Sequence, residues 1–403
     1  MPGPLDGLKV IELAHIMSGP TCGMMLADMG ADVIKIEKVP GGDDTRRMTP
    51  PVIADQSAAF MMMNRNKRGM AIDLKTEGGK EILLRMVRQS DVILENFRHD
   101  TLDRLGLGYE RLRQENPALI YCAVSGFGRT GPYATRGGFD LVAQGMSGLM
   151  SITGEGDGRP PVKVGAPVSD TTAGVLAAMG ILAAYISRLK TGKGQIVDAS
   201  LFEAAIMHTY WQSAICLATG DSPKPMGSAH PLNGPYQAFQ TKDGWVNIGG
   251  ANQANWERIA RTVGLPDLIE DARFRTNADR MANLKELEGL LTAELRKHSS
   301  HYWLVRFEQE GVPAGPVMSI AEMLEDPHVA DRGMVTTVDH PTAGRVKTLG
   351  LPVHFSETPG SVNRPAPLFG EHNAEVLAEF GFTASEVADF RSSGAIRDNQ
   401  EAK

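Results

Sequence analysis

The fold is set by the stretch LKVIELA at residues 8–14, a short apolar run typical of a buried strand. Runs of the same kind recur along the first third of the chain: ADVIKI at 31–36, MAIDL at 70–74, DVIL at 91–94 and ALIYCAV at 118–124. Segments 23–29, 78–88 and 101–105 between them have helical spacing or composition. Strands that alternate with helices predict βαβ crossovers, and therefore an α/β fold with a Rossmann-like doubly wound parallel sheet.

Changes in composition predict the domain boundaries. Residues 171–189 form a long, mostly apolar predicted helix, and the Gly- and Pro-rich stretch 221–235 is typical of a linker. Alternating residues at 236–250 indicate a hairpin. We therefore predict a large domain at residues 1–220, a smaller α+β domain at 225–325, and a C-terminal segment at 330–403 that returns to the large domain.

The overall composition narrows the possible functions. The chain has 403 residues and a formal net charge of −7, without the basic surplus that nucleic-acid binding requires. Cys22, Cys122 and Cys216 show no metal-type or disulfide-type spacing, which fits a reducing compartment. The N-terminal residues lack the pattern of a signal peptide, and the longest apolar run, 173–186, is shorter than the ~20 residues of a membrane span. We expect a cytoplasmic protein with no nucleic-acid or membrane partner.

Two short motifs have only weak support as sites. The sequence from Gly126 to Gly131 matches G-x-G-x-x-G, but it follows the fifth predicted strand and no acidic partner stands about 20 residues on, so a turn or a close approach is favoured over dinucleotide binding. His298 and His301 lack a third ligand, and no metal site is predicted. We interpret His208, on an apolar segment, as a hydrogen-bonded core residue.

Charged residues near the predicted strand ends leave two questions open. Asp170 stands where the long apolar helix begins, and the residue pattern alone favours a helix cap over a catalytic carboxylate. Basic residues in loops after the strands could bind a phosphorylated ligand or form a solvated rim. They are Lys35, Lys38, Arg46, Arg47, Arg65, Lys67, Arg68, Arg98 and Arg104.

Taken in order, these segments resemble the class III CoA-transferases, which include formyl-CoA and carnitine CoA-transferases. The resemblance covers nearly the whole chain. It rests on an ordered set of motifs: residues 4–15 with Gly19-Pro20, 30–37, Gly42-Asp-Asp-Thr-Arg46, Asn64-Arg-Asn-Lys67, Glu95-Asn-Phe97, 105–109, Gly126-Phe-Gly128, Gly131-Pro-Tyr133, Gly138-Phe-Asp140, Lys190-Thr-Gly-Lys-Gly194, 311–316 and 367–372.

The resemblance implies a catalytic role for Asp170 and reverses the preference for a cap. Its carboxylate would attack an acyl-CoA thioester, giving an aspartyl mixed anhydride and then an aspartyl-CoA thioester. The resemblance also implies coenzyme A as a substrate rather than a tightly bound cofactor, an interlocked homodimer, and a flexible glycine loop at Gly249 and Gly250. Residues implied to contact CoA or the thioester are His15, Met17, Ser18, Lys38, Ile72, Lys75, Asn96, Phe97, Arg98, Arg104, Phe139 and Asp140.

The substrate is suggested by the closest resemblance within the family. Asn64-Arg-Asn-Lys67 and residues 229–239 are most similar to members that move CoA among short dicarboxylic acids. We therefore expect succinyl-CoA as the donor, with Arg47 or Arg65 pairing a distal carboxylate. Two alternatives remain: an α-methylacyl-CoA racemase, although Phe139 stands where that group has a histidine, and a CoA-binding regulatory protein.

Overall fold

The computed structural model describes residues 2–156 and 158–398, which form two compact units. The first unit comprises residues 1–147, 164–208 and 327–403, and the second comprises residues 148–163 and 209–326. The predicted large domain, residues 1–220, includes residues 148–163 and 209–220, which the structure groups with the second unit. Whether the predicted ranges fold as separate domains stays a prediction.

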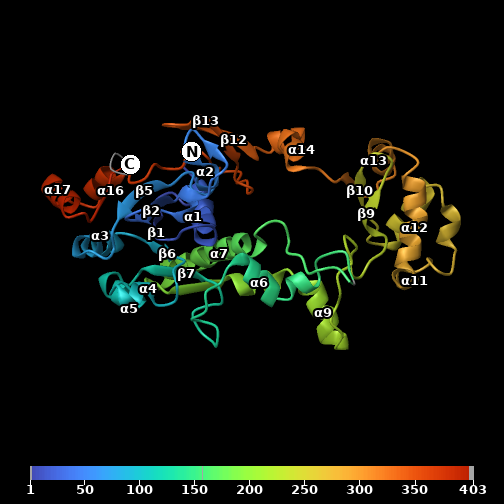
Figure 1. Cartoon of the computed structure of the whole chain (residues 1–403), viewed down its shortest axis with the longest axis horizontal. Coiled ribbons are helices and arrows are strands. Elements are labelled where there is room, and N and C mark those ends of the chain that lie inside the picture. Colours follow the sequence, from blue (N-terminus) through green and yellow to red (C-terminus); the bar gives the residue numbers. More distant parts are fainter. Residues whose placement is uncertain (1, 157, 399–403) are drawn as a thin grey trace. The chain divides into compact units, whose positions relative to one another are not determined.

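A six-stranded, all-parallel sheet forms the centre of the first unit, in the order β5-β2-β1-β6-β7-β8 (Figure 1). The α/β class with a doubly wound parallel sheet is therefore confirmed. The bounds are β1 Lys9–Glu12, β2 Asp32–Lys38, β5 Arg68–Ile72, β6 Val92–Glu95, β7 Ile120–Ser125 and β8 Ile196–Ser200. The strand order reverses between β1 and β6, which leaves a crevice beyond their carboxyl ends.

Alternate residues of these strands build two cores, one on each face of the sheet. Val10 and Val33 face the helices α1, α7 and α8, whereas Ile11 and Ile34 face α3, α5, α16 and α17. These helices are α1 Ser18–Asp28, α3 Glu77–Val87, α5 Tyr109–Glu115, α7 Val168–Thr191, α8 Leu201–Met207, α16 Asn373–Glu379 and α17 Ala384–Ser392. Burial on both faces explains why the strands are continuous apolar runs.

Shorter elements complete the first unit. The C-terminal segment lies along the edge strand β5, where Asn373 accepts a hydrogen bond from the Ala71 amide at 3.0 Å and Ile396 pairs with Ile72. The remaining elements are η1 Asp44–Arg47, β3 Val52–Ile53, β4 Gln56–Ser57, α2 Ala58–Met63, α4 Thr101–Arg104, α6 Asp140–Met146, α15 Pro327–Asp331, β12 Val335–His340 and β13 Gly344–Leu349.

The second unit is built on a three-stranded antiparallel sheet in the order β11-β10-β9. Strands β9 and β10 form the predicted hairpin. Trp256, Phe274 and Phe307 pack in the core of this unit. The elements are η2 Leu149–Ser151, α9 Tyr210–Thr219, β9 Tyr236–Gln240, β10 Trp245–Gly249, α10 Gln253–Thr262, η3 Pro266–Ile269, α11 Asn277–Ala282, α12 Leu284–Leu295, α13 Ser300–Gln309, β11 Ala314–Pro316 and α14 Ile320–Glu325.

By length and composition, α7 is a helix that could cross a membrane. In the structure its residues Ala173, Ala177 and Ile181 are buried with α1 and the sheet. It is therefore a core helix. Gly174 brings the two helices close, because a Cβ at this position would lie 2.6 Å from the carbonyl oxygen of Ser18.

Gly174→Ala tests this close approach. We expect the free energy of unfolding to fall by about 1–3 kcal/mol, since α1 backbone must move to admit the methyl group. Gly289→Ala is the matched control, because Gly289 lies within α12 with nothing near its added Cβ. That variant should be unchanged or more stable by up to ~1 kcal/mol. Equal effects of the two substitutions in urea unfolding would show that the α1–α7 contact is not tight.

Candidate active site

Two adjoining cavities of about 370 and 410 Å³ lie beyond the carboxyl ends of the parallel strands. His15, which follows β1, lines both of them, and so do Phe97 and Thr101, which follow β6. The cavities therefore sit at the point where the strand order reverses, which is the usual ligand site of a doubly wound sheet.

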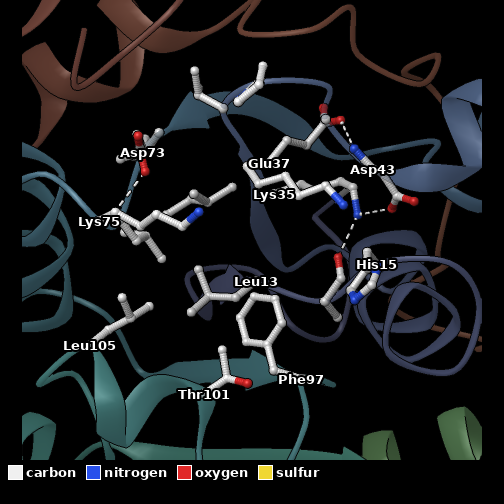
Figure 2. A pocket seen from close by; sticks show the side chains of 18 residues that line it. Leu13, His15, Lys35, Glu37, Asp43, Asp73, Lys75, Phe97, Thr101 and Leu105 are labelled. Carbon is white, nitrogen blue, oxygen red and sulfur yellow. Dashed lines mark hydrogen bonds and ion pairs between the residues drawn. The ribbon is translucent and has the colours of Figure 1, made fainter.

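The first cavity combines apolar walls with two lysines (Figure 2). Leu13, Phe97 and Leu105 supply apolar surface, and the His15 and Phe97 rings lie 5.9 Å apart. Lys75 extends into the cavity, and Lys38 also lines it, paired with Asp44 at 2.9 Å. An apolar slot with cations beside it suits a ligand that carries a flat ring and phosphate groups.

The second cavity contains Asp170, in the first turn of α7. No side chain at the N-cap position of this helix bonds to the exposed amides. Instead, Asp140 from α6 accepts a hydrogen bond from the Ser169 amide at 2.9 Å and another from the Gln144 side chain at 2.7 Å. The interpretation of Asp170 as the helix cap is therefore wrong, and its carboxylate is available to the cavity.

The surroundings of Asp170 make its carboxylate easier to protonate than usual. Burial and the neighbouring negative charge of Asp140 raise the pKa of Asp170 to about 6, although a hydrogen bond from Ser18 opposes the shift. Burial also lowers the pKa of His15, against the pull of Asp43 and Asp44. A desolvated carboxylate that is still mostly ionised at neutral pH suits nucleophilic attack.

The comparisons agree with this geometry. The profile of CoA-transferase family III matches residues 5–373. The chain is 42% identical to a succinate–glutarate CoA-transferase of Agrobacterium fabrum, over 93% of this chain and 95% of that one. It is 40% identical to an acetyl-CoA:oxalate CoA-transferase of Acetobacter aceti, over 94% of this chain and 96% of that one.

A crystal structure of a CAIB/BAIF family protein from Brucella suis superimposes with a TM-score of 0.84 at 41% identity, covering 94% of this chain and 100% of that chain. The chain belongs to CoA-transferase family III. It is a class III CoA-transferase, an enzyme that moves CoA between acyl-CoA and carboxylic acids, and the resemblance inferred from its motifs is confirmed.

Most residues that the resemblance assigns to CoA lie around the two cavities of this CoA-transferase. Lys38, Ile72, Lys75 and Phe97 line the first cavity. The second is lined by His15, Met17, Ser18, Asn96, Phe97, Arg98 and Phe139 together with Asp170. Arg104 lines neither cavity and pairs with Asp100 at 2.9 Å. Asp140 holds the start of α7, as described above.

Several basic residues expected at the strand ends of the CoA-transferase have another role. Arg65 is buried and pairs with Asp28 at 2.7 Å, Arg68 with Asp32 at 2.7 Å, and Arg46 with Glu37 at 2.6 Å. Lys35 and Lys67 are fully buried and share Glu12. Each of these side chains is therefore paired with a carboxylate of the same unit rather than standing free in a solvated rim.

The glycine-rich segments were expected to turn, approach another segment or hinge. At Gly126 and Gly138 two segments approach each other closely, because a Cβ on Gly126 would lie 2.6 Å from the Gly138 Cα. Gly249 and Gly250 lie in the second unit, where their amides donate to Pro313 and Pro235, each at 2.8 Å. The role of these two glycines as an active-site lid stays a prediction.

Two features of the site were not predicted. Arg136 lines the second cavity, although it belongs to none of the motifs that were singled out on either side of it. Its guanidinium lies 4.1 Å from the centre of the Tyr133 ring, and a basic residue beside an aromatic one was the available signal. The buried network on Glu12 was also missed. His208, expected to be a hydrogen-bonded core residue, contacts the Thr172 hydroxyl at 2.8 Å but is exposed, so the prediction of a core position is wrong.

Proposed function

We propose that Asp170 is the nucleophile of this CoA-transferase. Its carboxylate attacks the acyl-CoA carbonyl and expels CoA thiolate, which leaves a mixed anhydride on Asp170. The thiolate then attacks the aspartyl carbonyl of the anhydride, forms an aspartyl-CoA thioester and releases the donor acid. The acceptor carboxylate attacks this thioester and regenerates thiolate, which takes the acyl group from the second anhydride and frees Asp170.

The observation that carries this proposal is the environment of Asp170. Its carboxylate lines the second cavity, while the capping task at its helix is done by Asp140. Burial first and Asp140 second raise its pKa to about 6, which still leaves it mostly ionised at neutral pH, with a reduced hydration shell. We further propose that the first cavity holds the nucleotide part of CoA, with Lys38 and Lys75 beside its phosphates.

Asp170→Ala tests the covalent step. We expect the rate of CoA transfer to fall by at least about 1000-fold, because the covalent route is lost, while CoA affinity measured by calorimetry stays close to that of the native protein. Native enzyme mixed with acyl-CoA and trapped with hydroxylamine should carry a hydroxamate at Asp170 in peptide mass spectra. A trapped adduct at Asp140 instead, or full transfer activity in the variant, contradicts the proposal.

The pH dependence gives a second test. Because only ionised Asp170 attacks and its pKa is raised to about 6, kcat/KM should fall as the pH drops through about 6. Asp140→Asn retains an oxygen for the Ser169 amide but removes the negative charge, so the acid limb should move to lower pH. The control is Glu110→Gln, on the exposed face of α5, which should leave the limb in place. An unmoved limb in Asp140→Asn contradicts the assignment.

We propose a short dicarboxylate, with succinyl-CoA as donor, as the substrate class. The names of the Agrobacterium and Acetobacter relatives both include a dicarboxylic acid. The two arginines predicted to pair the distal carboxylate line neither cavity. Arg65 is held by Asp28, and Arg47 pairs with Asp44. Arg136 takes their place, because it lines the cavity of Asp170 on the loop that leads into Asp140.

Arg136→Met tests the anchor. KM for succinate and glutarate should rise about 10- to 100-fold, the range expected for a lost charge-assisted contact, whereas the kinetics with butyrate should not change. Arg113→Met is a matched control, since Arg113 is an exposed residue of α5 paired with Glu110. An equal loss for mono- and dicarboxylic acids would place Arg136 in a general role and remove the basis for dicarboxylate selection.

The racemase alternative needs a proton-transfer group on each face of the substrate α-carbon. Phe139 lines the second cavity, and its ring cannot accept a proton. The structure offers no observation that favours this reaction or a purely regulatory role. The interlocked homodimer and the cytoplasmic location implied by the sequence stay predictions.

A further inference from the structure

The loop between β1 and α1 contains a strained residue at the edge of the proposed reaction centre. Ile16 has a backbone φ of +67°, a left-handed conformation that is rare for a β-branched residue. Of the four described non-glycine residues with positive φ, Ile16 is the β-branched one, and it lines the second cavity with Asp170. Such strain persists only where neighbouring contacts impose it.

The contacts that impose it come from Asp43. Its two carboxylate oxygens lie 3.1 and 3.3 Å from the Ile16 amide nitrogen, which donates to them. Thr45 fixes the same carboxylate through its amide at 2.9 Å and its hydroxyl at 2.8 Å. Asp43 is 2% exposed, so solvent does not compete with these bonds.

Asp43 is in turn part of a buried chain of charges. Lys35 contacts Asp43 at 2.8 Å (Figure 2). It also contacts Glu12 at 3.0 Å and the carbonyl oxygen of Ala14 at 2.8 Å. Lys67 donates to Oε1 of Glu12 at 3.0 Å, lies 2.9 Å from its Oε2, and donates to the carbonyl oxygen of Pro20 at 3.0 Å. The network therefore holds the loop at Ala14 and Ile16, and the first turn of α1 at Pro20.

The end of this loop and the start of α1 carry groups that face the second cavity. Met17 and Ser18 line it, and Ser18 hydrogen-bonds Asp170. Asn96 fixes the preceding residue, accepting from the His15 amide at 2.9 Å and donating to its carbonyl at 2.7 Å. With both sides held, the turn at Ile16 sets the direction in which Met17 and Ser18 leave.

We propose that Asp43 is a positioning residue that holds Ile16 in its left-handed conformation and so places Met17 and Ser18 against Asp170. Asp43 lines the first cavity and not the second, so it acts on the surroundings of Asp170 through the backbone of Ile16. The inference rests on the proposed role of Asp170 and deepens it, because it says how the loop opposite the nucleophile is aimed.

The test is a rescue of the Asp43→Ala variant by glycine at position 16. Asp43→Ala should lower kcat about 100-fold with little change in KM for acyl-CoA, since a small misplacement of the reacting groups is costly. Adding Ile16→Gly should recover at least about tenfold, because glycine adopts positive φ without a steric penalty and no longer needs the imposed contact. The kcat of Ile16→Gly alone is the reference against which the recovery in the double variant is expressed.

Ala54→Gly is the matched control for the rescue. Ala54 is exposed, has a φ of +45° and lies between β3 and β4, so glycine relieves strain there without touching the loop. Combined with Asp43→Ala it should restore no activity. The proposal is overturned if Ala54→Gly and Ile16→Gly restore kcat equally in Asp43→Ala. It is also overturned if neither restores kcat in a variant with a native melting curve.

A second variant keeps the test decisive if Asp43→Ala does not fold. Asp43→Asn keeps an acceptor oxygen for the Ile16 amide, and the same pair of rescues is then measured on it, with a smaller initial loss expected. Failure of the proposed function is separately visible, because it would leave Asp170→Ala active whatever happens at Asp43. Rescue by Ile16→Gly with an inactive Asp170→Ala supports both.

Discussion

The site depends on a carboxylate that the sheet buries completely. Glu12 ends the first strand with no exposed surface and is neutralised by Lys35 and Lys67, both equally buried. Such a network contributes little net stability, because desolvation offsets much of the attraction, yet removing one member typically costs about 3–5 kcal/mol. Its effect is therefore geometric: the chain after β1 has to leave along a path on which carbonyl groups meet the two lysines.

That path determines the electrostatics around Asp170. Every cation of the network is paired with a carboxylate of the network, so none is directed at Asp170. Asp170 meets Asp140 and burial instead, and both raise its pKa. A cation beside Asp170 would hold its carboxylate ionised but would also weaken its attack. Arg98 and Arg136 line the same cavity, but neither contributes to the pKa shift of Asp170, so the carboxylate is left without a cation that would weaken the proposed attack.

Much of the fold could be predicted from the sequence, and the misses have physical causes. Strands buried on both faces appear as apolar runs, so β1, β2, β5, β6 and β7 were identified. Strand β8 was missed because it is an edge strand whose residues are largely exposed or half-buried and include Asp198. Its sequence carries no continuous apolar run, and only pairing with β7 makes it a strand.

The site was harder to predict because its partners are distant along the chain. Lys35 and Lys67 lie 23 and 55 positions from Glu12, and their burial cannot be seen in local composition. The capping of α7 by Asp140, 29 positions before Ser169, decides the role of Asp170, whereas local pattern alone favoured the cap. The resemblance to the family pointed to Asp170. The structure shows why its carboxylate is free to face the second cavity: Asp140 does the capping.

The same arrangement separates the reaction from the choice of acid. The groups proposed to fix Asp170 are held by contacts inside the unit: Asp140 bonds the start of α7, and Asp43 and Glu12 belong to the buried network. The groups that can meet the distal part of an acid, Arg136 and Phe139, lie on the exposed segment between β7 and α6. Substitutions there alter shape and charge without disturbing buried pairs. Related enzymes named for oxalate and for glutarate can therefore share one fold while differing in the acid, since the demands of thioester chemistry and of acid recognition fall on different parts of the chain.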